Sequence, residues 1–122
     1  MARPVSDLAK TTTMYRRGLG LRIVGNFENH DGFDGVMLAF ASADYHFEFT
    51  HCRNDAAPPA AAIEDLIVLY IPDPAEWTAT CASMLDAGFR RVGSSNPYWE
   101  VHGRTFEDAD GYRIVLQNAE PG

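Results

Sequence analysis

The chain has 122 residues, of which 46% are hydrophobic, and a formal net charge of -7. This length and composition suit one globular domain, or two half-domains that share a core. The acidic balance excludes a typical nucleic-acid-binding protein, because contacts to phosphates require clustered Lys and Arg residues.

The first half of the chain predicts a strand, a helix and three further strands. Asp7 is a suitable N-cap, and apolar residues recur at helical spacing from Leu8 until Gly18 or Gly20, either of which can end a helix. Asn29-His30-Asp31-Gly32 has the composition of a turn. The expected strands cover residues 2–6, 21–27, 35–41 and 45–50.

The second half predicts the same order of elements. Asp73 is placed to cap a helix that ends at Gly88, and Asp110-Gly111 is placed to turn the chain into its last strand. The expected strands cover residues 65–71, 89–92, 98–106 and 112–117. Module one would then span about residues 1–55 and module two about 63–118. Between them, a linker over about residues 56–62 contains Pro58-Pro59 and a run of alanines.

The two halves also repeat each other in sequence. Val5-Ser6-Asp7-Leu8 opens the first half, as Ile71-Pro72-Asp73-Pro74 opens the second. Glu48, near the end of the first half, falls opposite Val115 in the second. Such a repeat indicates two supersecondary units that complete one core, and hence an α+β fold.

Neither a membrane helix nor a secretion signal is predicted. No apolar run reaches the roughly 20 residues that a membrane helix needs, and Arg3 and Pro4 interrupt the start of the chain. The two cysteines, Cys52 and Cys81, are too few for a disulfide framework. We therefore expect a cytoplasmic protein with reduced thiols, in which Cys81 is buried on a helix.

Several phrases, in this order, resemble the vicinal oxygen chelate superfamily of glyoxalases, bleomycin-resistance proteins and extradiol dioxygenases. They are Val5-Ser6-Asp7-Leu8, Gly18-Leu19-Gly20-Leu21, Asn96-Pro97-Tyr98-Trp99 and Thr105-Phe106-Glu107-Asp108-Ala109-Asp110-Gly111-Tyr112-Arg113-Ile114. The last is similar to the superfamily signature F-x-D-P-D-G-x-x-I-E-L, with Ala109 in place of Pro and Val115 in place of Glu. The resemblance implies two βαβββ modules that form an open, eight-stranded, barrel-like cleft with the helices outside.

The resemblance also implies where a metal would bind. Metal-dependent members take ligands from four equivalent places, two in each module. In this chain these places are Glu48, Leu66, Val115 and a position ahead of Met1, which would exist only if the true start lies upstream. Leu and Val cannot bind a metal. We therefore expect no cofactor and disfavour a divalent metal, since Glu48 is the only ligand-type residue left.

Strand alternation identifies the side chains that would face the cleft. His46, Glu48 and Thr50 share one strand face, while Phe47 and Phe49 face the helix. The residues expected to line a ligand-binding cleft are His46, Glu48, Thr50, Tyr70, Tyr98, Trp99, Arg113 and Gln117. A mostly apolar concavity with a few convergent polar groups is typical of a small-molecule site.

Other interpretations of these residues remain open. Glu48 and Arg113 could form an ion pair that closes the barrel. His46, Glu48, His51 and Cys52 could hold a relocated metal. Tyr98 and Trp99 could stack on a planar ligand, or belong to the core or to a dimer interface.

Three classes of function follow. The first is a homodimeric protein that binds a small organic molecule without a metal. The second is a metal-dependent lyase, isomerase or dioxygenase that acts on a substrate with two vicinal oxygens. The third is a non-catalytic dimeric scaffold with a filled cleft. The missing ligand set favours the first, with catalytic residues unknown.

Overall fold

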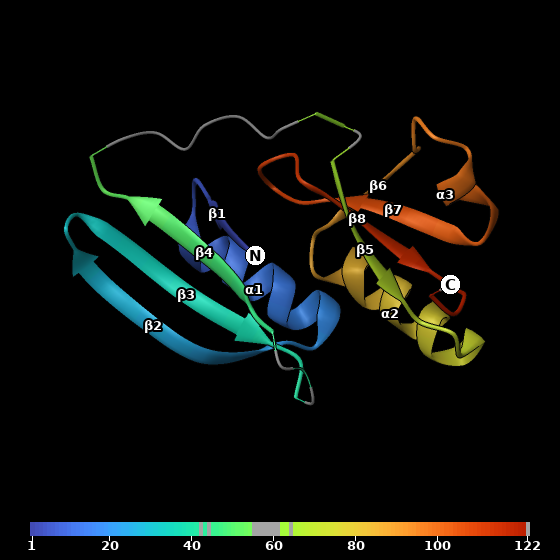
Figure 1. The fold of residues 1–122 in the computed structure, drawn as a ribbon, viewed down its shortest axis with the longest axis horizontal. Coiled ribbons are helices and arrows are strands. Elements are labelled where there is room, and N and C mark those ends of the chain that lie inside the picture. Colours follow the sequence, from blue (N-terminus) through green and yellow to red (C-terminus); the bar gives the residue numbers. More distant parts are fainter. Residues whose placement is uncertain (42, 44, 55–61, 64, 122) are drawn as a thin grey trace.

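The computed structural model describes residues 1–41, 43, 45–54, 62–63 and 65–121. It confirms the α+β fold with two βαβββ modules, each built on a four-stranded mixed sheet (Figure 1). Module one comprises β1 (Ala2–Pro4), α1 (Leu8–Leu19), β2 (Arg22–His30), β3 (Phe33–Ala39) and β4 (Phe47–Cys52). Module two comprises β5 (Leu66–Tyr70), α2 (Pro74–Asp86), β6 (Arg90–Val92), α3 (Tyr98–Val101), β7 (Gly103–Glu107) and β8 (Arg113–Gln117).

The two sheets have the same topology. Sheet one has the strand order β1-β4-β3-β2, and sheet two has the order β5-β8-β7-β6. In each, the first strand pairs in parallel with the last, and the other pairings are antiparallel. The first strand of each module is therefore an edge strand, as expected from a crossover helix that precedes two hairpins.

Both long helices begin where the sequence predicts. The Asp7 carboxylate accepts a hydrogen bond from the Lys10 backbone N–H, and the Asp73 carboxylate accepts one from that of Glu76. These caps satisfy backbone donors that have no partner inside the helix. Gly20, in the left-handed conformation with φ of 71°, ends α1.

The first hairpin is longer than expected. β2 continues to His30 and β3 begins at Phe33, so the turn shrinks to Asp31 and Gly32, both of which have positive φ. A tight turn with two left-handed residues matches the twist of the strands it joins. The expected linker over residues 56–62 lies, except for residue 62, outside the described part of the chain.

The strand expected at residues 98–106 is partly wrong, because residues 98–101 form the short helix α3 and β7 begins only at Gly103. Pro97 takes φ of -59° in the helical region, and the Asn96 side-chain oxygen accepts a hydrogen bond from the Tyr98 backbone N–H. This start of a helix outweighs the strand propensity of Tyr98 and Trp99.

The modules meet through their helices, which lie side by side in the middle of the molecule (Figure 1). Gly18 of α1 leaves room for Met84 of α2 and for Phe89, and the Tyr15 ring packs edge-on against Phe89 with the centroids 5.1 Å apart. One hydrophobic core joins both modules and includes Cys81, which is buried as expected. In this chain the helices thus lie between the modules and not outside a shared cleft.

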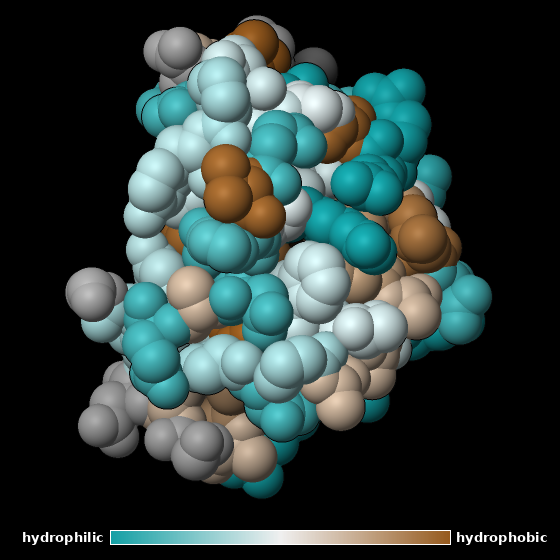
Figure 2. Space-filling model, turned by 90° about the vertical axis from the view of Figure 1, so that its right-hand side faces the viewer, coloured by the Kyte–Doolittle hydropathy of each residue, from teal (hydrophilic) through white to brown (hydrophobic). Residues whose placement is uncertain are grey.

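Along the described part of the chain, no helix is long and apolar enough to cross a membrane. The face of module two is a mosaic of hydrophilic and hydrophobic residues, with the hydrophobic ones in separate groups (Figure 2). The candidate sites are therefore the cavities of the surface and the faces of the sheets.

Candidate functional site

Sheet one has one face packed on α1 and an opposite, open face. Phe47 and Phe49 are buried on the helix side, as expected. On the open face, Glu48 lies between Met37 of β3 and Ala2 of β1. His46 Nε2 lies 3.6 Å from Glu48 Oε1, and the Glu48 side chain is 28% exposed. Thr50 lies on the same face, two residues after Glu48 along β4.

Sheet two has the corresponding arrangement around α2. Ile114 and Leu116 are buried on the helix side, where the Trp77 indole N–H donates to the Leu116 carbonyl at 2.8 Å. The open face carries three residues of β5 and three of β8, in the register Leu66–Arg113, Val68–Val115 and Tyr70–Gln117. The structure therefore puts Tyr70, Arg113 and Gln117 on the face that strand alternation predicts.

Arg113 pairs within its own module. Its Nε donates to Glu107 Oε2 at 3.2 Å, and its Nη1 donates to the Gly93 carbonyl at 3.2 Å. The ion pair between Arg113 and Glu48, one of the alternatives that the sequence left open, is absent from the described structure, because the two residues lie on sheets that do not pair. Glu48 interacts with His46 instead.

The short helix α3 covers the middle of the open face of sheet two. Val115 is fully buried there, and a cavity lies on each side of α3: one beside Leu66 and Trp99, the other beside Tyr70 and Tyr98. Tyr98 and Trp99 contact each other edge to face, with centroids 4.9 Å apart. They lie on a helix above the sheet and not, as expected, on a strand.

Two polar side chains under α3 are buried without a hydrogen-bond partner. Thr105 is 1% exposed and Gln117 is 3% exposed, yet Thr105 Oγ1 and Gln117 Oε1 each lack a partner. Buried polar groups are nearly always paired, so unpaired ones call for an explanation. The sequence predicts Gln117 as a site residue but gives no sign that it would be unpaired.

Of the three places implied by the resemblance that lie within the given sequence, only Glu48 carries a donor atom, so together they do not fit a metal. On the neighbouring strand, Ala2 lies beside Glu48 in sheet one. In sheet two, Val68 lies beside Val115 and Leu66 lies beside Arg113. Alanine, leucine and valine carry no donor atom. Among the described residues no group of three or more His, Cys, Asp and Glu side chains could hold a metal ion. His51 Nδ1 lies 3.1 Å from the Val5 carbonyl, consistent with a backbone contact.

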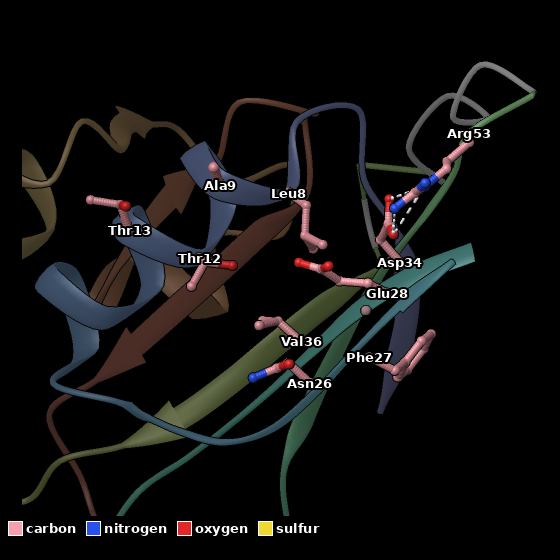
Figure 3. Close-up of a pocket in the computed structure, with 11 residues that line it drawn as sticks. Leu8, Ala9, Thr12, Thr13, Asn26, Phe27, Glu28, Asp34, Val36 and Arg53 are labelled. Carbon is pink, nitrogen blue, oxygen red and sulfur yellow. Dashed lines mark hydrogen bonds and ion pairs between the residues drawn. The ribbon is translucent and has the colours of Figure 1, made fainter. Parts of the chain in front are cut away.

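A cavity of about 580 Å³ lies on the helix side of sheet one, between α1 and the β2–β3 hairpin. Asn26 and Glu28 point toward α1, whereas Phe27 points away from it (Figure 3). Arg53 holds Asp34 through a bidentate pair, and this pair lowers the pKa of the Asp34 carboxyl. The cavity is wide open, and the Asp34 carboxylate already neutralises the Arg53 guanidinium that lines it.

A buried polar network joins the modules, and the sequence does not reveal it. Asp108, in the turn before β8, accepts hydrogen bonds from the Arg3 guanidinium and from the Tyr15 hydroxyl, which lies 2.8 Å away. The Arg3 guanidinium also lies 3.8 Å from the centroid of the Tyr112 ring. Burial raises the pKa of the Tyr15 hydroxyl, an effect that the nearby Arg3 charge partly offsets.

Comparison with known proteins agrees with the resemblance. Residues 1–50 match the YycE-like N-terminal domain, and residues 64–118 match the YycE-like C-terminal domain. The chain is 39% identical over 120 residues to the uncharacterized protein YycE of Bacillus subtilis (strain 168), covering 98% of this chain and 86% of YycE.

Solved structures show the same fold. A crystal structure of Bacillus subtilis YycE, a protein of unknown function, has a TM-score of 0.93 at 38% identity, over 100% of this chain and 89% of that one. The trypanothione-dependent glyoxalase I of Leishmania major has a TM-score of 0.74 at 19% identity, over 98% and 84% of the chains. The fosfomycin resistance protein FosX of Mesorhizobium loti has a TM-score of 0.73 at 16% identity, over 98% and 89%.

Proposed function

Because the chain belongs to the YycE-like family of the glyoxalase/bleomycin-resistance/fosfomycin-resistance superfamily, we propose that it binds a small organic molecule, without a metal, against the open faces of its sheets. One observation carries the proposal. Each sheet packs one face on a long helix and carries polar groups among apolar neighbours on the other, which in sheet two is partly covered by α3. Sites for small molecules have this composition.

The two open faces differ in charge. The face of sheet one offers the Glu48 carboxylate beside His46, which suits a cationic group or a hydrogen-bond donor. The face of sheet two offers Arg113, whose charge Glu107 partly neutralises. A ligand that contacts both faces would thus carry a donor or cation at one end and an acceptor at the other.

A thermal-shift screen of small organic acids and cationic drugs tests this function, because a ligand that binds only the folded state raises the melting temperature. Glu48→Gln should weaken the binding of cationic ligands, and Arg113→Gln that of carboxylates or phenolates. Because Glu48 is partly exposed and not paired with Arg113, Glu48→Gln should cost less than about 1 kcal/mol of stability. If neither substitution alters any binding found, the function is not on these faces.

We further propose that a second copy of the chain completes the cleft. Since α1 and α2 contact each other between the modules, the open faces of one chain's two sheets cannot face each other. β5 is also an edge strand of five apolar or aromatic residues, all of them partly exposed. Exposed apolar edges are usually covered, and a two-fold homodimer is the commonest way for two copies to cover each other.

Mixing two variants tests the shared cleft. If sheet one of each copy faces sheet two of its partner, a mixed dimer of Glu48→Gln and Arg113→Gln chains has one cleft with both native residues. Ligand binding should then recover in that cleft. If each cleft belonged to one chain, every cleft in the mixture would carry one substitution and binding would not recover.

A further inference from the structure

One end of the open face of sheet two holds a cavity of about 320 Å³. It lies between β5, α3 and the residues that follow β8, and Tyr70, Tyr98, His102, Gln117 and Glu120 contribute to its lining. We propose that this cavity is the subsite for a small aromatic carboxamide, neutral or cationic, with Gln117 as the residue that recognises the amide. This inference rests on the proposed function and specifies its ligand class.

The state of Gln117 carries the inference. The residue is 3% exposed and lines the cavity, and its Oε1, which lies against Gly103 of β7, has no hydrogen-bond partner among the described residues. A buried amide oxygen without a partner destabilises the folded protein, and a leucine at this position would avoid that cost. A group that makes the fold less stable is typical of a binding residue that awaits its ligand.

The surroundings of Gln117 are shaped around its amide. The side chain lies where a Cβ on Gly103 would stand, and the Trp99 carbonyl of α3 would lie 2.7 Å from that same Cβ. Rotating the amide by half a turn exchanges its nitrogen and its oxygen, so either atom can lie against Gly103 while the other is offered to a ligand in the cavity. A carboxamide has both groups and is complementary to another amide in either orientation.

The rest of the lining selects the charge and size of the ligand. Tyr70 and Tyr98 supply aromatic surface, and Tyr98 is 61% exposed. Among the described residues that line the cavity there is no Lys or Arg, whereas the Glu120 carboxylate is one of them. A carboxylate or phosphate ligand is therefore disfavoured, and a neutral or cationic one is favoured. The volume, at the lower end for ligand sites, suits a single ring with a short substituent.

Nicotinamide and nicotinate form a matched pair of probes, because they differ only in having an amide or a carboxylate on the same ring. Isothermal titration of the full chain should show saturable binding of nicotinamide, and at least tenfold weaker binding of nicotinate. Gln117→Leu should weaken nicotinamide at least tenfold, because the ligand amide then faces a side chain without polar groups. The same variant, without ligand, should have an unchanged or higher melting temperature.

A matched control removes an amide from the cavity between α1 and the β2–β3 hairpin. Asn26→Leu changes an exposed amide beside α1 and should leave nicotinamide binding unchanged. Tyr98→Ala should weaken the binding of nicotinamide several-fold, since it removes aromatic surface from the cavity.

Three results would overturn the subsite. They are no saturable nicotinamide binding, equal binding to the native chain and to Gln117→Leu, and a fall of several degrees in the melting temperature of ligand-free Gln117→Leu. In any of these cases, ligands from the wider screen that respond to Glu48→Gln would leave the proposed function standing. If Gln117→Leu weakens nicotinamide binding, while Glu48→Gln and Arg113→Gln change the binding of no ligand, the function is confined to this cavity.

Discussion

Asp108 is the single residue on which the contact between the modules depends most. It accepts hydrogen bonds from Arg3 and Tyr15 of module one and from two backbone N–H groups of its own turn. Asp108→Asn leaves the Arg3 guanidinium buried without a counter-charge. We expect a loss of about 3–5 kcal/mol in the free energy of unfolding, measured by urea denaturation.

Asp110 provides the control, because it lies two residues away in the same turn and hydrogen-bonds Ser6 at the surface. Asp110→Asn should cost less than about 1 kcal/mol. Equal effects of the two substitutions would show that the buried pair does not hold the modules together.

Tyr15 makes stability depend on pH at the alkaline end. Burial raises its pKa, so the folded protein keeps the hydroxyl proton that the unfolded chain releases above the ordinary tyrosine pKa of about 10. The contribution of Tyr15 is therefore complete below about pH 9 and is lost as the pH rises past 10, by about 1.4 kcal/mol per pH unit.

Unfolding curves of native protein and Tyr15→Phe at pH 8 to 11.5 measure this effect. Phe lacks the hydroxyl, so the difference in stability between the two proteins should narrow above pH 10. A difference that stays constant over this range would mean that Tyr15 ionises equally in both states.

The positions of side chains that depend only on local structure were predictable from the sequence. Strand alternation places His46, Glu48, Thr50, Arg113 and Gln117 on the open faces, because side chains alternate in any strand. The network of Arg3, Tyr15 and Asp108 was not predictable. It depends on how the modules pack, and no local pattern marks three residues that are so far apart in the chain.

Among the secondary-structure elements, the packing of α3 on sheet two can be tested directly. Gly103 has no Cβ, and one added there would lie 2.7 Å from the Trp99 carbonyl, a backbone atom that cannot rotate away. Gly103→Ala should therefore push α3 off sheet two and cost about 1–3 kcal/mol. The fluorescence of Trp99 should shift to longer wavelength as water reaches it.

Gly93 is the matched control, since a Cβ there would meet nothing within 4 Å. Gly93→Ala should change stability by less than about 0.5 kcal/mol and leave the fluorescence as it is. A Gly103→Ala variant that behaves like Gly93→Ala would show that α3 does not rest on β7 as described.

The repeat predicts most elements because each carries its own local signals. Asp7 and Asp73 mark the helix starts, and Gly20 marks a helix end. α3 was missed because Tyr98 and Trp99 favour strands, and the competing signal, Asn96-Pro97, also occurs in turns.

At the scale of the whole molecule, the sequence predicts two modules but not how they meet. Two βαβββ units can join through sheet edges or through helices, and in both arrangements each helix buries its apolar face against its own sheet. Tight packing at Gly18, Met84 and Phe89, together with the Arg3–Asp108 pair, fixes the helix contact. One chain therefore presents two open faces on separate sheets.

The mass of the protein in solution tests the proposed function most directly, because the proposed cleft needs the open faces of two copies to form one site. Light scattering coupled to size exclusion, at micromolar concentration, should give twice the chain mass of 13.5 kDa. A single species at 13.5 kDa would contradict the shared cleft and leave each open face to bind ligands alone.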